Sequence, residues 1–110
     1  MKTGVELIAE ERQRQIEKEG WDSKHDDEHV PFSMSTAGAV YALDLYKNWL
    51  ISIRGRNQTI QLINNTLDIL WPWDGKWWKP TPDNPIRQLT KAGALIAAEI
   101  DRLQRLEEKT

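Results

Sequence analysis

The chain has 110 residues, of which 39% are hydrophobic and 29% charged, and its formal net charge is −2. This length and composition are typical of a single globular domain spanning residues 1–110, and the charge argues against tight, nonspecific binding to nucleic-acid backbones. The lack of cysteine excludes disulfides, thiolate metal sites and cysteine nucleophiles. Tryptophan is unusually abundant: there are six, against two Tyr and one Phe.

The sequence gives no sign of a membrane or export segment. The N-terminal residues turn acidic at Glu6 without an apolar stretch, and no apolar run approaches the roughly 18 residues that a membrane helix needs. We therefore expect a cytoplasmic protein without a membrane partner.

Residues 4–19 are predicted to form the first helix, which Gly20 ends. At 100° per residue, one stripe of this helix carries the apolar residues Val5, Ile8, Ala9 and Ile16. The same stripe also carries Arg12 and Glu19, with Glu11 and Gln15 along its edge. Charges on an inward face are costly unless they are paired. These polar residues are therefore expected either to pair inside the fold or to line a cleft.

Residues 21–29 have no helical period and are predicted to be a polar loop, which Pro31 closes. The loop contains the run His25-Asp26-Asp27-Glu28-His29. Adjacent carboxylates repel each other, and a hard cation such as Mg²⁺ relieves that repulsion. The alternative is a solvated turn whose aspartates cap the chain that follows.

The two histidines are four residues apart, a spacing that would place both on one face of a helix, as in zinc hydrolases. The accompanying glutamate of that zinc motif is absent and the segment lacks a helical period. The sequence therefore disfavours a zinc site here.

Two further helices are predicted next, at 33–53 and 58–70, with a break at 54–57. Ser33 is the expected N-cap of the first. Its inward face is predicted to hold Met34, Ala37, Tyr41 and Leu45, and that of the second Ile60, Ile63, Leu67 and Leu70.

The stretch 71–85 is predicted to be a loop, because it holds four of the five prolines together with four tryptophans. Such a cluster should bury most of its area as a small core that pins the loop to the bundle. The functional alternative is that Trp73 or Trp78 offers a flat face to a nucleobase, with Lys76 and Lys79 near the attached phosphates.

The last predicted helix, 85–107, has Asp83 or Asn84 as its cap and Pro85 in its first turn. Its inward face is predicted to carry Leu89, Gly93, Ile96, Ile100 and Leu103. Lys91 lies about 200° around the axis from Leu89 and is either a solvated lysine or a phosphate contact. The predicted fold is all-α: a compact bundle of three to four helices with a Trp/Pro-rich loop before the last one.

Small residues on two of these helices predict a homo-oligomer, because short helices with such faces often complete their core against a second copy. These residues are Ala37, Gly38, Ala42, Gly93, Ala94 and Ala97.

Several strings in order resemble a family of small proteins encoded by phages and prophages. They are Glu11-Arg12-Gln13-Arg14-Gln15, Glu19-Gly20-Trp21, His25-Asp26-Asp27-x-His29, Tyr41-Ala42, Trp71-Pro72-Trp73, Trp77-Trp78-Lys79-Pro80, Lys91-Ala92-Gly93-Ala94-Leu95-Ile96 and Glu99-Ile100. The resemblance covers most of the chain apart from about 47–68.

More distantly, the chain resembles the MazG-like all-α nucleoside triphosphate pyrophosphohydrolases. This resemblance implies a Mg²⁺-dependent enzyme that hydrolyses a nucleotide phosphoanhydride. The metal ligands would be Glu11, Glu19, Asp26 and Asp27, with Glu11, Glu19 and Asp27 as the catalytic carboxylates. The ligand-binding residues would be Arg12, Gln15, His25, Trp73, Trp78, Lys79 and Lys91.

Two alternatives to an enzyme stay open. The first is a phage protein that sequesters nucleotide signals of host defence without turnover, a function that needs aromatic residues and cations but no water-activating carboxylate. Ser33, where the phage family is expected to carry a glutamate, favours this reading. The second is an interaction protein whose tryptophan loop packs on another chain.

Overall fold

The structure, a computed structural model, describes residues 1–109 and is helical throughout, with no strand in that range. Its elements are α1 (Gly4–Glu19), α2 (Ser23–Asp27), α3 (Ser33–Arg54), α4 (Gln58–Leu70), the 3₁₀ turn η1 (Gly75–Trp77) and α5 (Pro85–Glu108). The predicted all-α bundle, its four longer helices and the tryptophan loop before the last helix are confirmed. The predicted loop at 21–29 is wrong in part, because Asp22 caps the short helix α2 through the His25 backbone N–H.

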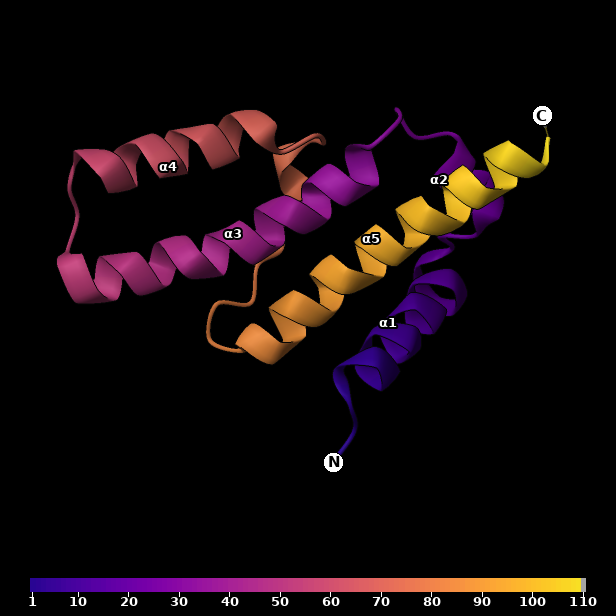
Figure 1. Cartoon of the computed structure of the whole chain (residues 1–110), viewed down its shortest axis with the longest axis horizontal. Coiled ribbons are helices and arrows are strands. Elements are labelled where there is room, and N and C mark those ends of the chain that lie inside the picture. The colour runs from indigo at the N-terminus through magenta and orange to yellow at the C-terminus, as the bar shows by residue number, and fades with distance from the viewer. Residues whose placement is uncertain (110) are drawn as a thin grey trace.

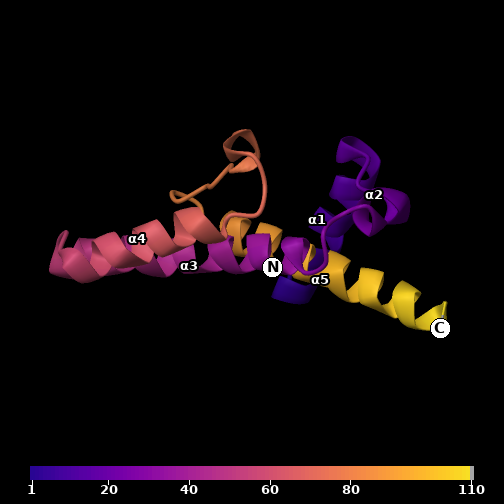
Figure 2. The same ribbon diagram turned by 90° about the horizontal axis from the view of Figure 1, so that it is seen from above.

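The helices form a layer from which two segments project. Helices α3 and α4 run side by side in opposite directions, α5 crosses α3, and α1 lies along the other side of α5 (Figure 1). Figure 2 shows that the loop between α4 and α5 and the α2 segment rise from the same side of this layer. Residues far apart in sequence therefore meet on that side.

Local residues set several helix ends, and those at Gly20 and Asn84 are as predicted. Thr3 and Glu6 form a reciprocal capping box, Gly20 adopts the left-handed conformation (φ 74°), and Asn84 caps α5. The predicted Ser33 cap is wrong: Phe32 occupies the cap position, and the Ser33 hydroxyl is buried without a partner among residues 1–109. Instead, Glu99 of α5 accepts hydrogen bonds from the Ser35 N–H and hydroxyl, so a neighbouring helix supplies the cap.

The core lies where α3 and α5 cross. It consists of Met34, Ala37, Tyr41, Ala92, Leu95 and Ala98. A β-carbon at Gly38 would stand only 2.8 Å from the Ala92 carbonyl oxygen, so the two backbones approach closely at this point. The small residues predicted to promote self-association are therefore used in part inside the chain, at this crossing.

The predicted inward face of α5 is wrong. Leu89 and Ile100 are each 51% exposed, whereas the buried face is small and polar. Its members are Gln88, Thr90, Ala92, Ala94, Leu95, Ala98, Glu99 and Arg102. The polar ones are tolerated because they are paired: Gln88 donates to the Tyr41 carbonyl and to Asp44, and Arg102 donates to Glu99.

The predicted inward stripe of α1 is also wrong, since Val5 is 79% exposed and Ile16 lies on the surface. Glu11 and Gln15, expected at the edge of the stripe, are the buried residues of this helix. On α3, the burial predicted for Met34 is confirmed.

Within residues 1–109, no helix combines the length and apolar character needed to cross a membrane.

Gly38→Ala should destabilise the fold by about 1–3 kcal/mol, because the added methyl group meets the Ala92 carbonyl and the α5 backbone cannot yield cheaply. This loss outweighs the roughly 1 kcal/mol by which alanine favours a helix over glycine. Urea unfolding measures it, with Gly4→Ala as the control, since nothing lies within 4 Å of a β-carbon there. Equal stability of the two variants would contradict the close crossing.

Candidate functional site

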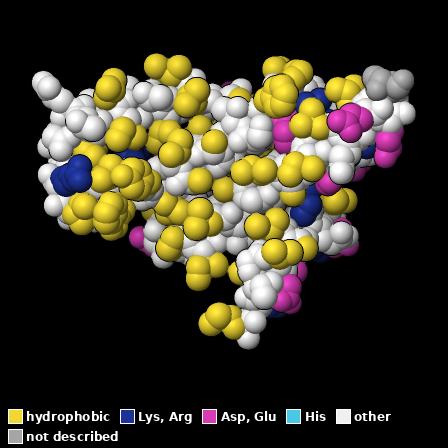
Figure 3. All heavy atoms as spheres, in the orientation of Figure 1, with side chains coloured by type: hydrophobic (Ala, Val, Ile, Leu, Met, Phe, Trp, Pro, Cys, Tyr) yellow, Lys and Arg dark blue, Asp and Glu magenta, His cyan; other side chains and the backbone are white. Residues whose placement is uncertain are grey.

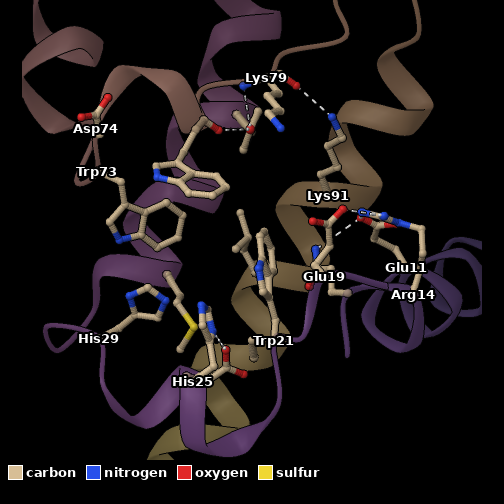
Figure 4. Close-up of a pocket in the computed structure, with 17 residues that line it drawn as sticks. Glu11, Arg14, Glu19, Trp21, His25, His29, Trp73, Asp74, Lys79 and Lys91 are labelled. Atoms are coloured by element: carbon tan, nitrogen blue, oxygen red, sulfur yellow. Dashed lines mark hydrogen bonds and ion pairs between the residues drawn. The ribbon is translucent and has the colours of Figure 1, made fainter. Parts of the chain in front are cut away.

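A cavity of about 400 Å³ lies on the side of the layer where α2 and the tryptophan loop project. Its aromatic wall is formed by Trp21, His25, His29, Tyr41, Trp73 and Trp77. Apolar side chains of α3 and α5 also line it, namely Met34, Leu95 and Ala98. The volume falls within the range of small-molecule sites. Figure 4 shows Trp73 and His29 on one side, Trp21 on another, and Lys79 and Lys91 at the end opposite His25.

The tryptophan loop is fixed to α3 mainly through Tyr41. The Tyr41 ring stacks on Trp78 at 4.7 Å between centroids and meets Trp71 edge-on at 5.5 Å. Its hydroxyl accepts a hydrogen bond from the Lys79 N–H at 3.1 Å. The expected small core is therefore present, with Trp71 and Trp78 packing inward, while Trp73 reaches the cavity.

Two lysines line the cavity without a carboxylate partner in the described chain. Lys91 Nζ donates to the Lys79 carbonyl at 2.8 Å, and Lys79 Nζ lies 5.7 Å from the centre of the Trp77 ring. Burial and the nearby Arg87 lower the pKa of Lys91. Both effects penalise an uncompensated positive charge, so an anion next to Lys91 would relieve them.

The buried carboxylate of Glu11 is held by two arginines. Glu11 Oε1 accepts from Arg14 Nε and from Arg87 Nη1, each at 2.7 Å. Burial by itself raises the pKa of Glu11, but the hydrogen bonds from Arg14 and Arg87 outweigh it and hold the pKa at about 2. Arg14 also donates to Glu19 at 3.0 Å. The polar residues of α1 thus form an internal charge network at the edge of the cavity. They both pair inside the fold and line a cleft, the two outcomes that the sequence allowed.

Gln15 is 2% exposed and lines the cavity beside this network. Its Nε2 donates to Glu11 Oε2 at 3.3 Å, which fixes the orientation of the amide because the carboxylate accepts only. Gln15 Oε1 has no partner among residues 1–109. A buried acceptor in this state is suited to a donor on a ligand.

Asp26 and Asp27 are adjacent in sequence but separate in the fold. Asp26 is 1% exposed and accepts from Arg12 Nη2 at 2.6 Å and contacts His25 Nδ1 at 3.2 Å. Asp27 is exposed, is held by Arg105 at 2.7 Å, and does not line the cavity.

The structure brings most of the predicted site residues to one cavity. They are Glu11, Gln15, Glu19, His25, Asp26, Trp73, Lys79 and Lys91. Arg12 lies behind Asp26, whereas Trp78 packs on Tyr41 and Asp27 lies elsewhere.

Four aromatic residues of the wall were not among the predicted ligand-binding residues: Trp21, His29, Tyr41 and Trp77. For Trp21 a local signal was available. It follows directly after Gly20, which ends α1 and turns the chain toward the cavity.

Among residues 1–109, the His, Asp and Glu side chains close enough to share a metal ion are His25, Asp26 and His29, whose ligating atoms lie within 4.8 Å of one another. By contrast, each of the four predicted magnesium ligands is bonded to an arginine. The pairs are Glu11 with Arg14 and Arg87, Glu19 with Arg14, Asp26 with Arg12, and Asp27 with Arg105.

Comparison of the chain with protein-family models, with curated proteins and with solved structures gives no match. The resemblance to the phage family and to the MazG-like enzymes therefore stays a prediction.

Acid should remove the stabilisation that Glu11 provides. Its pKa is about 2 in the folded chain against about 4.5 for an ordinary glutamate. Its contribution is therefore complete above pH 4.5 and is lost as the pH falls toward 2. The shift corresponds to about 3 kcal/mol at most. Glu11→Gln should lower the free energy of unfolding markedly at pH 7 and much less at pH 2.5.

Urea unfolding at both pH values measures this difference, and Glu10→Gln is the control, because Glu10 is an exposed glutamate on the same helix. A deficit of Glu11→Gln that is the same at the two pH values would contradict the assigned role of its charge.

Proposed function

We propose that the chain binds a nucleotide or a nucleotide-derived signal in the cavity and holds it without metal-dependent hydrolysis. The observation that carries this proposal is the pairing of an aromatic wall with two lysines that lack carboxylate partners in the described chain. A cytoplasmic location, expected from the sequence, is part of the same proposal.

The aromatic wall suits a nucleobase. Trp21, Trp73 and Trp77 line the cavity from two different segments of the chain. Figure 4 shows Trp21 and Trp73 on different sides of it, so a base can lie between aromatic side chains. Stacking of a base on an aromatic side chain is worth about 1–3 kcal/mol per base. Gln15 Oε1 adds an unpaired acceptor that an exocyclic amino group could satisfy.

The charges favour a phosphorylated ligand. The lining carboxylates of Glu11, Glu19 and Asp26 are compensated by arginines, and that of Asp74 accepts from the Lys76 backbone N–H. Lys79 and Lys91 have no carboxylate partner within residues 1–109. The local balance at the lysine end therefore attracts an anion, even though the net charge of the chain is −2.

Magnesium does not fit the residues predicted to hold it. Both oxygens of Glu11 accept from guanidinium groups, and Glu19 and Asp26 each give one oxygen to an arginine at 3.0 and 2.6 Å. These three carboxylates therefore do not offer Mg²⁺ the set of oxygen ligands that it prefers. Asp27 is held away from the cavity by Arg105. We therefore derive no hydrolytic step through Mg²⁺, and of the alternatives that the sequence left open the arrangement supports sequestration.

The second alternative to an enzyme, an interaction protein that uses the tryptophan loop, has less support. Trp71, Trp73 and Trp78 pack against the core and only Trp77 is largely exposed, so the loop offers little aromatic surface to another protein.

Titration of the protein with nucleosides and with nucleoside mono-, di- and triphosphates should quench the tryptophan fluorescence saturably, and the phosphorylated ligands should bind more tightly. Lys91→Met should weaken binding of a triphosphate at least about tenfold, equivalent to 1.4 kcal/mol, and leave binding of the nucleoside nearly unchanged. Isothermal titration calorimetry measures both.

Lys18→Met is the matched control, because it removes one positive charge from α1 at an exposed position. Equal triphosphate affinity in the two variants would contradict the phosphate contact, and no binding of any nucleotide would overturn the proposal. Mg²⁺-dependent product formation that Glu19→Gln abolishes would establish the enzyme instead.

We also propose that the chain forms a homo-oligomer through the apolar face of α5. Ile100 lies nine residues after Lys91, about 180° around the helix axis, so this face points away from the cavity. It carries the exposed residues Ile86, Leu89, Ile96 and Ile100. Figure 3 shows hydrophobic side chains spread over much of one side of the molecule. Such an area is unusual on a monomer, and the small net charge of −2 opposes contact between two copies only weakly.

Sedimentation velocity should accordingly show a dimer or larger species, and Ile100→Glu should shift it to the monomer, because a buried unpaired carboxylate opposes association. Val30→Glu adds the same charge at an exposed position between α2 and α3 and should leave the distribution unchanged. If the wild-type protein is still a monomer at a concentration of about 100 micromolar, the proposal is contradicted.

A further inference from the structure

The two histidines of the chain and one buried aspartate meet at the end of the cavity opposite Lys79. His25, Asp26 and His29 place their ligating atoms within 4.8 Å of one another. Figure 4 shows His25 and His29 close together below Trp73. His25 Nδ1 lies 3.2 Å from Asp26 Oδ1.

Local backbone structure creates this arrangement. Asp22 caps α2, and the turn continues past its last residue because the His29 N–H bonds to the Asp26 carbonyl at 3.2 Å. Histidines four residues apart therefore share one face of this turn, with ring centroids 4.8 Å apart. The lack of a helical period was one of the two sequence-based arguments against zinc at this position, and α2 with the turn after it answers that argument. The other, the missing glutamate of the zinc-hydrolase motif, concerns hydrolysis and not the three ligands themselves.

We propose that His25, Asp26 and His29 bind a divalent transition-metal ion of the zinc class. Two imidazole nitrogens and one carboxylate oxygen suit Zn²⁺ or Co²⁺, whereas Mg²⁺ prefers oxygen ligands and octahedral geometry. Three protein ligands leave a coordination position that faces the cavity, where all three side chains are part of the lining.

Neighbouring residues hold the three ligands in place. Arg12 Nη2 occupies Asp26 Oδ2 at 2.6 Å, which leaves Oδ1, the oxygen beside His25, as the ligand. The His25 ring lies parallel to Trp21, with an interplanar angle of 2°, and His29 packs against Trp73 at 5.0 Å. Such outer partners orient metal ligands and commonly contribute tenfold or more to affinity.

Only a small adjustment would close the site. Donor atoms on a tetrahedral ion with bonds of about 2.0 Å lie roughly 3.3 Å apart. His25 Nδ1 and Asp26 Oδ1 are already 3.2 Å apart. Since the three ligating atoms lie within 4.8 Å of one another, their separations have to shorten by about 1.5 Å at most. His29 lies two residues after the end of α2, in the connection to α3.

The first test uses the unmodified protein. Because the chain has two histidines, each imidazole gives its own nitrogen signals in a ¹⁵N-labelled sample. After chelator treatment, titration with Zn²⁺ and without nucleotide should shift the ring nitrogens of both histidines and saturate at one ion per chain. Mg²⁺ should shift neither. Zn²⁺ shifts that involve neither imidazole, or that appear only in large excess, would overturn the proposal.

The second test compares variants by calorimetry and by Co²⁺ absorption. His29→Gln should weaken Co²⁺ binding at least about tenfold, because it removes a ligand without changing the charge of the neutral ring. Asp26→Asn should do the same, and circular dichroism checks that loss of the Arg12 ion pair leaves it folded. Glu28→Gln, the matched control, removes a charge beside the cluster and should stay within about twofold of wild type.

Equal affinities in wild type and His29→Gln would overturn the site. Since no nucleotide is present in either test, failure here leaves the proposed nucleotide binding untouched, and failure of nucleotide binding leaves this site untouched.

Discussion

The close approach of α3 and α5 at Gly38 organises the molecule. With the Ala92 carbonyl 2.8 Å from the position of a β-carbon on Gly38, only a small-residue face of α5 can turn toward α3. Turning that face inward points Lys91, Leu95 and Ala98 to the cavity. It also leaves large apolar residues on the opposite side of α5 exposed, with Leu89 and Ile100 at 51% each.

Charge pairing then divides the cavity into two kinds of surface. Arginines neutralise the carboxylates at its edge, most completely at Glu11, whose pKa falls to about 2. The lysines are bonded only to backbone oxygen or lie near aromatic rings. The cavity therefore has an end suited to anions, at Lys79 and Lys91, and a separate cluster of imidazole and carboxylate groups around Asp26. Both open into the same space.

The sequence predicted the helices well because their ends depend on local chemistry. Gly20 and Asn84 act in the structure as their residue types indicate. Helix faces were harder to predict. Hydrophobic periodicity selects the most apolar stripe, but α5 buries Gln88 and Glu99, which hydrogen-bond to Asp44 and Ser35 of α3, and such partners are invisible in a single helix. Ser33 failed as a cap for the same reason, since Glu99 took its place.

The amino-acid sequence by itself determined the all-α class, the position of the tryptophan loop and eight of the 17 residues that line the cavity, because capping, proline placement and residue chemistry act over a few neighbours. The tertiary structure decided which of those residues work together. It placed His29 against Trp73 and Asp27 against Arg105. Such choices depend on contacts between residues up to 78 positions apart, which no local pattern encodes.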